Sequence, residues 1–262
     1  MNIDPIVIAG FARTPMAAFQ GAFARVTAAH LGAAAVRAAV ERAAVPANAI
    51  DRIYMGCVLP AGQGQAPARQ VAIKAGLPLS VEATTVNKMC GSGMQATIMA
   101  AEALAAGAAD IIVAGGMESM TNAPFLLAKH RSGARIGHDT IIDSMMTDGL
   151  EDAYDRGKPM GAFAEDSARD YQFSRAEQEE YALLSLSRAK NAVASHLFAT
   201  ELTHVTVPGR NGEIIVAEDE QPAKSAARES PHAQAGIREG RIDHGCHVGI
   251  HFRWGGGAGP HP

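Results

Sequence analysis

The sequence predicts an α/β fold in which helices cover a sheet that contains parallel strands. Short apolar runs alternate with alanine-rich stretches of helical spacing over the first 118 residues. An alternation of strand and helix is typical of a parallel sheet with both faces covered. The 262 residues are 47% hydrophobic and 19% charged, which is ordinary for a globular protein that can build a proper core.

The expected strands are short apolar runs that end in glycine or in a polar turn. Such runs indicate buried strands. The first run ends at Gly10 and opens the sheet, and a Gly/Gln loop at 62–65 follows the second. The expected strands are 6–10, 50–58, 83–86 and 109–114.

The expected helices carry start and stop signals. Thr27 precedes the first helix and Pro46 ends it, and Gly76 stops the second. From 119 to 220 the pattern is less regular and indicates an excursion away from the sheet. Within that excursion, Ser174 and Glu177 form a capping box before one clear helix. The expected helices are 28–44, 67–75, 91–106 and 175–195.

The composition excludes several classes of partner. A net charge of -4 and a pI near 6.2 give no basic field for nucleic acid or an anionic membrane. The N-terminus lacks the features of a signal peptide, and no apolar segment is long enough to span a membrane. Three scattered cysteines, Cys57, Cys90 and Cys246, indicate a reducing compartment rather than a disulfide framework. We therefore expect a cytoplasmic protein with no nucleic-acid or membrane partner.

Cys90 is the candidate nucleophile. It stands between the strand expected at 83–86 and the helix expected at 91–106. The positive end and unpaired N–H groups of a helix N-terminus stabilise an anion such as a thiolate. Catalytic loops in α/β folds also lie at the carboxyl ends of strands, where this cysteine falls. A cysteine without such a setting is usually a small buried hydrophobe, which is our interpretation of Cys57.

Several long motifs resemble those of the thiolases, the acetyl-CoA C-acetyltransferases. They occur in the order and at the spacing of that family and extend over nearly all of residues 5 to 224. The motifs are ARTP (12–15), TVNKMCGSGMQA (85–96), AGGMESMTNAPF (114–125), MGAFAEDSARDYQFSRAEQEEYALLSLSRA (160–189) and GRNGEIIVAEDEQP (209–222).

The resemblance implies a thiolase-like αβαβα fold of two similar halves, of which this chain carries the first. Residues 1–118 would form the N-terminal half-domain, and 119–224 would form part of an inserted loop domain. Cys90 matches the cysteine that thiolases acylate. An acyl group would pass from acyl-CoA to Cys90 and then to acetyl-CoA, by Claisen condensation or, in reverse, by thiolysis. The resemblance implies a coenzyme A thioester as substrate, no cofactor or metal, and a homo-oligomer, dimer or tetramer, in the intact family.

The resemblance also suggests further site residues. A tetrahedral intermediate needs N–H donors for its oxyanion, and we expect the backbone at Cys90 and Gly91 to supply them. Met160 matches a family residue near bound CoA, and filling a core is an equally good explanation of it. Pro159 stands where many biosynthetic thiolases have a histidine. This departure argues against a histidine contact to CoA and against acetoacetyl-CoA as the preferred substrate.

Residues 225–262 differ from the rest of the chain. They hold half of its ten histidines and its only tryptophan, without a usable hydrophobic period. If their codons are read one nucleotide later, a thiolase-like continuation can be written. We therefore interpret the tail as non-native sequence that follows a one-nucleotide shift near codon 224. The spacing Cys-His-x3-His at 246–251 is too weak a signal to predict a zinc site.

The predicted function follows from these motifs and from those that are missing. An N-E-A motif, a G-H-P histidine and a C-x-G cysteine belong to the family's second half, and none occurs in this sequence. We expect a thiolase-type acyltransferase whose condensation and thiolysis are impaired. The alternative is a non-catalytic fragment that dimerises or binds acyl-CoA. A ketoacyl synthase-like enzyme would share the cysteine but not the M-G-x-x-A-E and G-G-M-E-S-M stretches.

Overall fold

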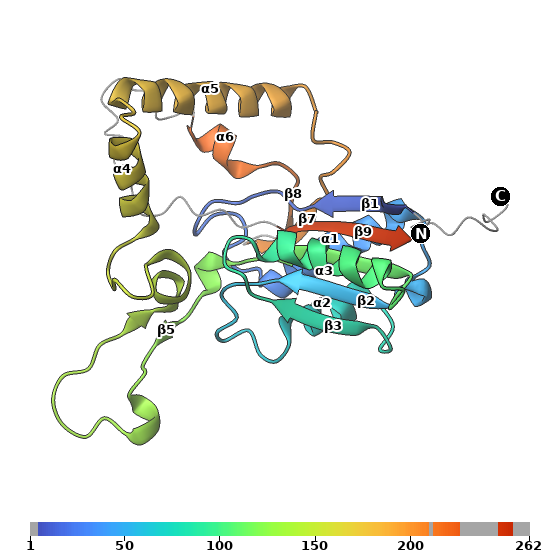
Figure 1. The fold of residues 1–262 in the computed structure, drawn as a ribbon, viewed down its shortest axis with the longest axis horizontal. Coiled ribbons are helices and arrows are strands. Elements are labelled where there is room, and N and C mark those ends of the chain that lie inside the picture. Colours follow the sequence, from blue (N-terminus) through green and yellow to red (C-terminus); the bar gives the residue numbers. More distant parts are fainter. Residues whose placement is uncertain (1–4, 210–211, 226–245, 254–262) are drawn as a thin grey trace.

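The computed structural model describes residues 5–209, 212–225 and 246–253 of the chain. They form a layered α/β unit, from which a long excursion of the chain stands apart (Figure 1). The central sheet has five strands in the order β1-β9-β4-β2-β3. These strands are β1 (Ile6–Arg13), β2 (Arg52–Gly56), β3 (Glu82–Val86), β4 (Ile111–Met117) and β9 (Cys246–Arg253).

The strands β2, β3 and β4 are parallel, as the sequence predicted. Helices α1 and α2 pack on one face of the sheet and α3 on the other. Side chains of β2 alternate between the two faces: Ile53 and Met55 join the core under α1 and α2, and Tyr54 joins the core under α3. The helices are α1 (Ala28–Ala43), α2 (Pro67–Ala75) and α3 (Ser92–Ala105).

The predicted helix signals are confirmed. The Thr27 hydroxyl caps α1 by accepting the N–H of His30, 3.3 Å away. Gly76 ends α2 with a φ of 85°, a backbone conformation that favours glycine. In the excursion, Ser174 and Glu177 each accept the backbone N–H of the other, which completes the capping box of α5.

The strand β9 is an element that the sequence analysis missed. It pairs antiparallel with β1 on one side and with β4 on the other. Val248, Ile250 and Phe252 occupy every second position of this segment, which is a strand pattern. The sequence analysis had found no hydrophobic period in this part of the chain. Whether the tail is non-native stays a prediction, and 226–245 and 254–262, with Trp254, lie outside the described residues.

The excursion carries little buried surface. Neither α4 nor α5 buries a residue, and Figure 1 shows both helices set away from the sheet. Within the described ranges, no helix combines the length and apolar composition that a membrane span needs. The elements are β5 (Phe125–Leu126), β6 (Ile142–Asp143), α4 (Met160–Asp170), α5 (Arg175–Ala194), and short turns of helix at Ala47–Ala49, Met120–Asn122, His130–Ser132 and Met146–Leu150.

After α5 the chain returns to the layered unit. A hairpin of β7 (Val205–Gly209) and β8 (Gly212–Val216) follows, and then α6 (Glu220–Ser225). Val205 and Val207 are buried in the same core cluster as α1. The last part of the predicted loop domain therefore packs against the N-terminal half.

Arg13, at the end of β1, joins this returning segment to the sheet. Its side chain is buried, with 3% of the residue exposed. The guanidinium donates two hydrogen bonds to the Asp219 carboxylate, at 2.7 and 3.0 Å, and one to Glu201 Oε1 at 2.5 Å. The central carbon of the guanidinium also lies 4.9 Å from the centre of the Phe198 ring. A paired fork of this kind satisfies a buried cation that would otherwise be very costly.

We expect Asp219→Ala to lower the free energy of unfolding by about 3 kcal/mol, because it leaves a buried guanidinium with half of its acceptors. Urea unfolding followed by circular dichroism measures the loss. Glu179→Ala is the control, since Glu179 pairs with Arg175 on the exposed surface of α5. That change should cost less than about 0.5 kcal/mol. Equal losses in the two variants would contradict the role given to Arg13.

Candidate active site

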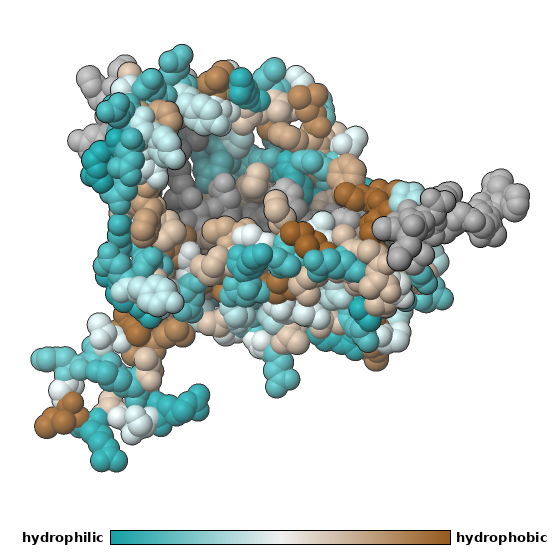
Figure 2. Space-filling model, viewed as in Figure 1, coloured by the Kyte–Doolittle hydropathy of each residue, from teal (hydrophilic) through white to brown (hydrophobic). Residues whose placement is uncertain are grey.

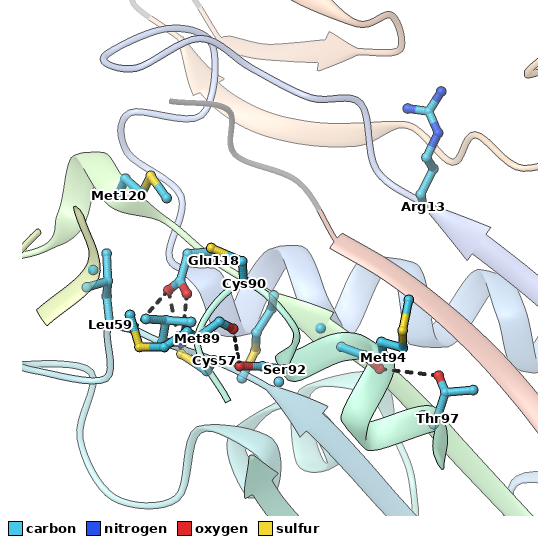
Figure 3. A pocket seen from close by; sticks show the side chains of 18 of the residues that line it. Arg13, Cys57, Leu59, Met89, Cys90, Ser92, Met94, Thr97, Glu118 and Met120 are labelled. Carbon is cyan, nitrogen blue, oxygen red and sulfur yellow. Dashed lines mark hydrogen bonds between the residues drawn. The ribbon is translucent and has the colours of Figure 1, made fainter. Parts of the chain in front are cut away.

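A largely apolar cavity of about 790 Å³ lies at the carboxyl ends of β2 and β4, and Cys90 lines it (Figure 3). The wall includes the end of β1, the first turns of α3 and the segment 145–150. The Cys90 thiol is free and exposed. The structure therefore places the predicted nucleophile where a substrate could reach it.

Because glycine has no Cβ, the first residues of α3 can lie close to the ends of the sheet strands. Gly56 ends β2 and pairs in register with Gly116 of β4. A Cβ on Gly56 would lie 2.7 Å from atoms of Ser92, and a Cβ on Gly116 would lie 3.4 Å from the Cα of Gly93. A side chain at Gly56 would push the helix start outward, whereas the distance at Gly116 is that of an ordinary van der Waals contact. Gly56 thus fixes how deeply Cys90 sits at the sheet edge.

The loop before α3 turns sharply at Met89. Met89 has a φ of 49°, in the left-handed region that residues with a Cβ rarely adopt. The Ser92 hydroxyl donates to the Met89 carbonyl at 2.5 Å and accepts the Lys88 N–H at 2.9 Å. On the other side, the Asn87 side-chain oxygen accepts the Met89 N–H at 3.1 Å. This turn presents Cys90 two residues before Ser92, the first residue of α3, one residue further from the helix than the predicted start at Gly91 implied.

The other predicted site residues have different settings. The Gly91 N–H donates to the Lys88 carbonyl at 3.1 Å, so Gly91 would have to exchange this partner to hold an oxyanion. Met160 begins α4, is 45% exposed and is not among the described residues of the cavity wall. The donor roles of Cys90 and Gly91 and the CoA contact of Met160 stay predictions.

Glu118 is a cavity residue that the sequence analysis missed. Its carboxylate accepts the N–H of Val58 at 2.7 Å and of Leu59 at 3.3 Å, and the Cys57 thiol lies 3.7 Å from one oxygen. Figure 3 shows Glu118, Cys57 and Leu59 together with Cys90 around the cavity. An acid directly after a buried strand is the signal that could have found it. Glu118 joins the end of β4 to the loop that follows β2.

Cys57 is a packed thiol, as the sequence predicted. Only 1% of the residue is exposed. Burial, with the nearby Glu118 carboxylate as a second cause, raises the pKa of the Cys57 thiol to about 12. Cys57 is therefore far less reactive than a free cysteine at neutral pH. Within the described part of the chain, no cluster of three His, Cys, Asp or Glu side chains could hold a metal ion.

We expect the stability of the protein to depend on pH through Glu118. Burial raises the pKa of Glu118 above its ordinary 4.5, although backbone donors partly offset this. Between the pKa of Glu118 in the unfolded chain and its higher pKa in the folded chain, the folded state holds more protons than the unfolded state. The free energy of unfolding therefore falls as the pH rises through this range. Glu118→Gln has no such proton to lose. The wild type should therefore lose stability relative to the variant from about pH 4.5 upward; urea unfolding at a series of pH values checks this, and parallel profiles would contradict it.

Comparison with known proteins identifies relatives of similar sequence. The chain is 46% identical over 219 residues to an acetyl-CoA acetyltransferase of Schizosaccharomyces pombe. The matched region covers 83% of this chain and 55% of that protein. It is 44% identical over 224 residues to a probable acetyl-CoA acetyltransferase of Escherichia coli, covering 86% and 57%. The chain thus spans little more than half the length of these relatives.

The fold has a close counterpart among solved structures. An acetyl-CoA acetyltransferase from Syntrophomonas wolfei superimposes with a TM-score of 0.86 at 33% identity, covering 96% of this chain and 65% of that one. The predicted thiolase-like fold is confirmed by this match. The family model described as "Thiolase, N-terminal domain" matches residues 6–234. Since that match takes in most of the sequence, the chain belongs to the thiolase family.

Proposed function

We propose that the chain takes part in thiolase-type acyl transfer, with Cys90 as the group that receives the acyl chain from acyl-CoA. The observation that carries this proposal is the exposed Cys90 thiol, held at the start of α3 on the wall of an apolar cavity. The cavity offers apolar contacts to an acyl chain, and the helix start offers N–H groups to an anion. The names of the relatives support acetyl-CoA as one substrate.

The first half-reaction is a transfer between two sulfur atoms. The Cys90 thiolate attacks the carbonyl carbon of the acyl-CoA thioester, and the carbonyl oxygen becomes an oxyanion. We place the backbone N–H groups of Cys90 and Gly91 as its donors. Collapse of the intermediate breaks the bond to the CoA sulfur, which leaves as a thiolate and takes up a proton. The product is a Cys90 thioester.

In the second half-reaction, the α-carbanion of acetyl-CoA attacks the Cys90 thioester and releases the cysteine. This step needs a base to remove a proton from acetyl-CoA. The described residues of the cavity wall include no histidine, and Cys57 is packed against Glu118 and Gln63. We therefore propose that acylation of Cys90 is the activity this chain supports, and that complete condensation or thiolysis is impaired.

The remaining parts of the proposal concern surroundings and partners. We propose a CoA thioester as the substrate with no further cofactor, a role in lipid metabolism, and a homo-oligomer in the intact family. The free thiols of Cys57 and Cys90 support a reducing compartment such as the cytoplasm. The acidic net charge gives no support to a nucleic-acid partner.

We expect incubation with acetyl-CoA to add one acetyl group to Cys90, because its thiol is exposed and Cys57 is buried. Intact-mass measurement followed by peptide mapping detects the group and locates it. Cys90→Ser should abolish the modification, and Cys57→Ser, the matched control, should retain it. An unmodified wild type, or an acetyl group that persists in Cys90→Ser, would overturn the proposed function.

One observation favours the second candidate, a chain that associates without catalysis. Ile8 and Phe11 of β1 and Met94 and Ile98 of α3 are exposed, and Figure 2 shows apolar side chains over these elements. Burial of such a face against a second copy would be favourable.

If the chain associates in this way, light scattering should give the mass of a dimer, and Met94→Glu should return it to a monomer. Leu79→Glu is the matched control, since Leu79 is as exposed as Met94, at 73%, but lies between α2 and β3. We expect this control to keep the dimer mass. A monomeric wild type would exclude the second candidate.

A further inference from the structure

The turn at Met89 is a strained feature that needs support from its surroundings. A residue with a Cβ keeps a left-handed backbone conformation only where neighbouring groups hold it there. The φ of 49° at Met89 directly precedes Cys90, so any relaxation of the turn would move the thiol. The support on the carbonyl side of Met89 is local, because Ser92 lies in the first turn of the following helix.

The support on the N–H side comes from residues that are distant in the sequence. The Met89 N–H donates to Asn87 Oδ1 at 3.1 Å, and Asn87 Nδ2 donates to the Val58 carbonyl at 3.4 Å. The Val58 N–H in turn donates to Glu118 Oε2 at 2.7 Å. These three hydrogen bonds form one series from the end of β4, through the loop after β2, to the turn before α3.

Glu118 fixes the middle of this series in more than one way. Its carboxylate also accepts the Leu59 N–H, so two successive peptide groups of the loop bind one side chain. Asn87 therefore donates to a Val58 carbonyl whose position is fixed by the hydrogen bonds that Glu118 accepts. An amide side chain is suited to this place, because it accepts from one backbone group while it donates to another.

We propose that Asn87 and Glu118 are positioning residues for Cys90, acting together through Val58 to hold the Met89 turn. This inference rests on the proposed function only in naming Cys90 as the reacting group. Neither residue takes part in bond making. Each acts by keeping the thiol at the start of α3 and facing the cavity.

The first test measures the turn itself and does not depend on activity. Amide hydrogen exchange of Met89, followed by NMR in the full chain, should be about fivefold faster in Asn87→Ala, the change expected for one neutral hydrogen bond. Glu118→Gln should show a smaller increase, because one acceptor oxygen remains. Since Glu118 acts through Asn87, the double variant should exchange no faster than Asn87→Ala alone. Asn191→Ala on α5 and Glu102→Gln on α3, both exposed, are the matched controls.

The second test separates positioning from general loosening. Acetylation of Cys90 by acetyl-CoA should slow about fivefold in Asn87→Ala. Alkylation by iodoacetamide, a small reagent that needs only an accessible thiolate, should change less than about twofold when it is run above the ordinary thiol pKa of about 8.5, where the thiol is ionised in every variant. Alkylation of buried Cys57 reports on unfolding and should stay at the wild-type level. Asn87→Asp keeps the acceptor for Met89 but loses the donor to Val58, so its acetylation rate should lie between those of wild type and Asn87→Ala.

The outcomes distinguish this inference from the proposed function. If Met89 exchange in Asn87→Ala equals that of the controls, or if the effects of Asn87→Ala and Glu118→Gln add, the positioning network is wrong. If acetylation and iodoacetamide alkylation fall together, the positioning role is also wrong. If wild-type Cys90 takes no acetyl group, the proposed function fails, and the exchange result alone decides whether the network holds the turn.

Discussion

The buried guanidinium of Arg13 is the constraint on which the arrangement of the chain depends. Its partners Glu201 and Asp219 lie 188 and 206 residues further along the sequence. A buried cation requires these acceptors, so the chain must come back to the end of β1 after its long excursion. That return brings Val205 and Val207 onto α1 and completes the larger core. One side chain thereby couples the excursion to the layered unit.

The parts of the fold that could be predicted are those with local signals. The helix α2 has the predicted bounds because a proline begins it and Gly76 ends it. The capping box at Ser174 fixed the start of α5 for the same reason. The place of β9 is different, since a strand between β1 and β4 is selected by backbone pairing with residues far away in the sequence. A local pattern at 246–253 cannot reveal two such neighbours.

The candidate site shows the same division. Cys90 was predictable because a strand, a cysteine and an alanine-rich helix follow one another in the sequence. Glu118 had a local signal, an acid directly after a buried strand, but its link to Asn87 through Val58 was not predictable, because that link exists only once β2 and β4 are paired with Gly56 beside Gly116. Gly56 itself is plain in the sequence, but the close approach that requires it appears only in three dimensions. The place of the candidate nucleophile could be predicted locally, and the contacts between the groups that hold it could not.

The position of β9 has a consequence for the order of events during synthesis. Strand β1 is made first and β9 late, and Ile6 pairs with Arg253 across nearly the whole length of the chain. Until the ribosome has released residues 246–253, β1 and the free side of β4 both present open backbone edges. Pairing over so long a separation is slow, and open edges attract other chains. A nascent chain of this protein would therefore expose these two edges to other chains between the making of β4 and the arrival of β9.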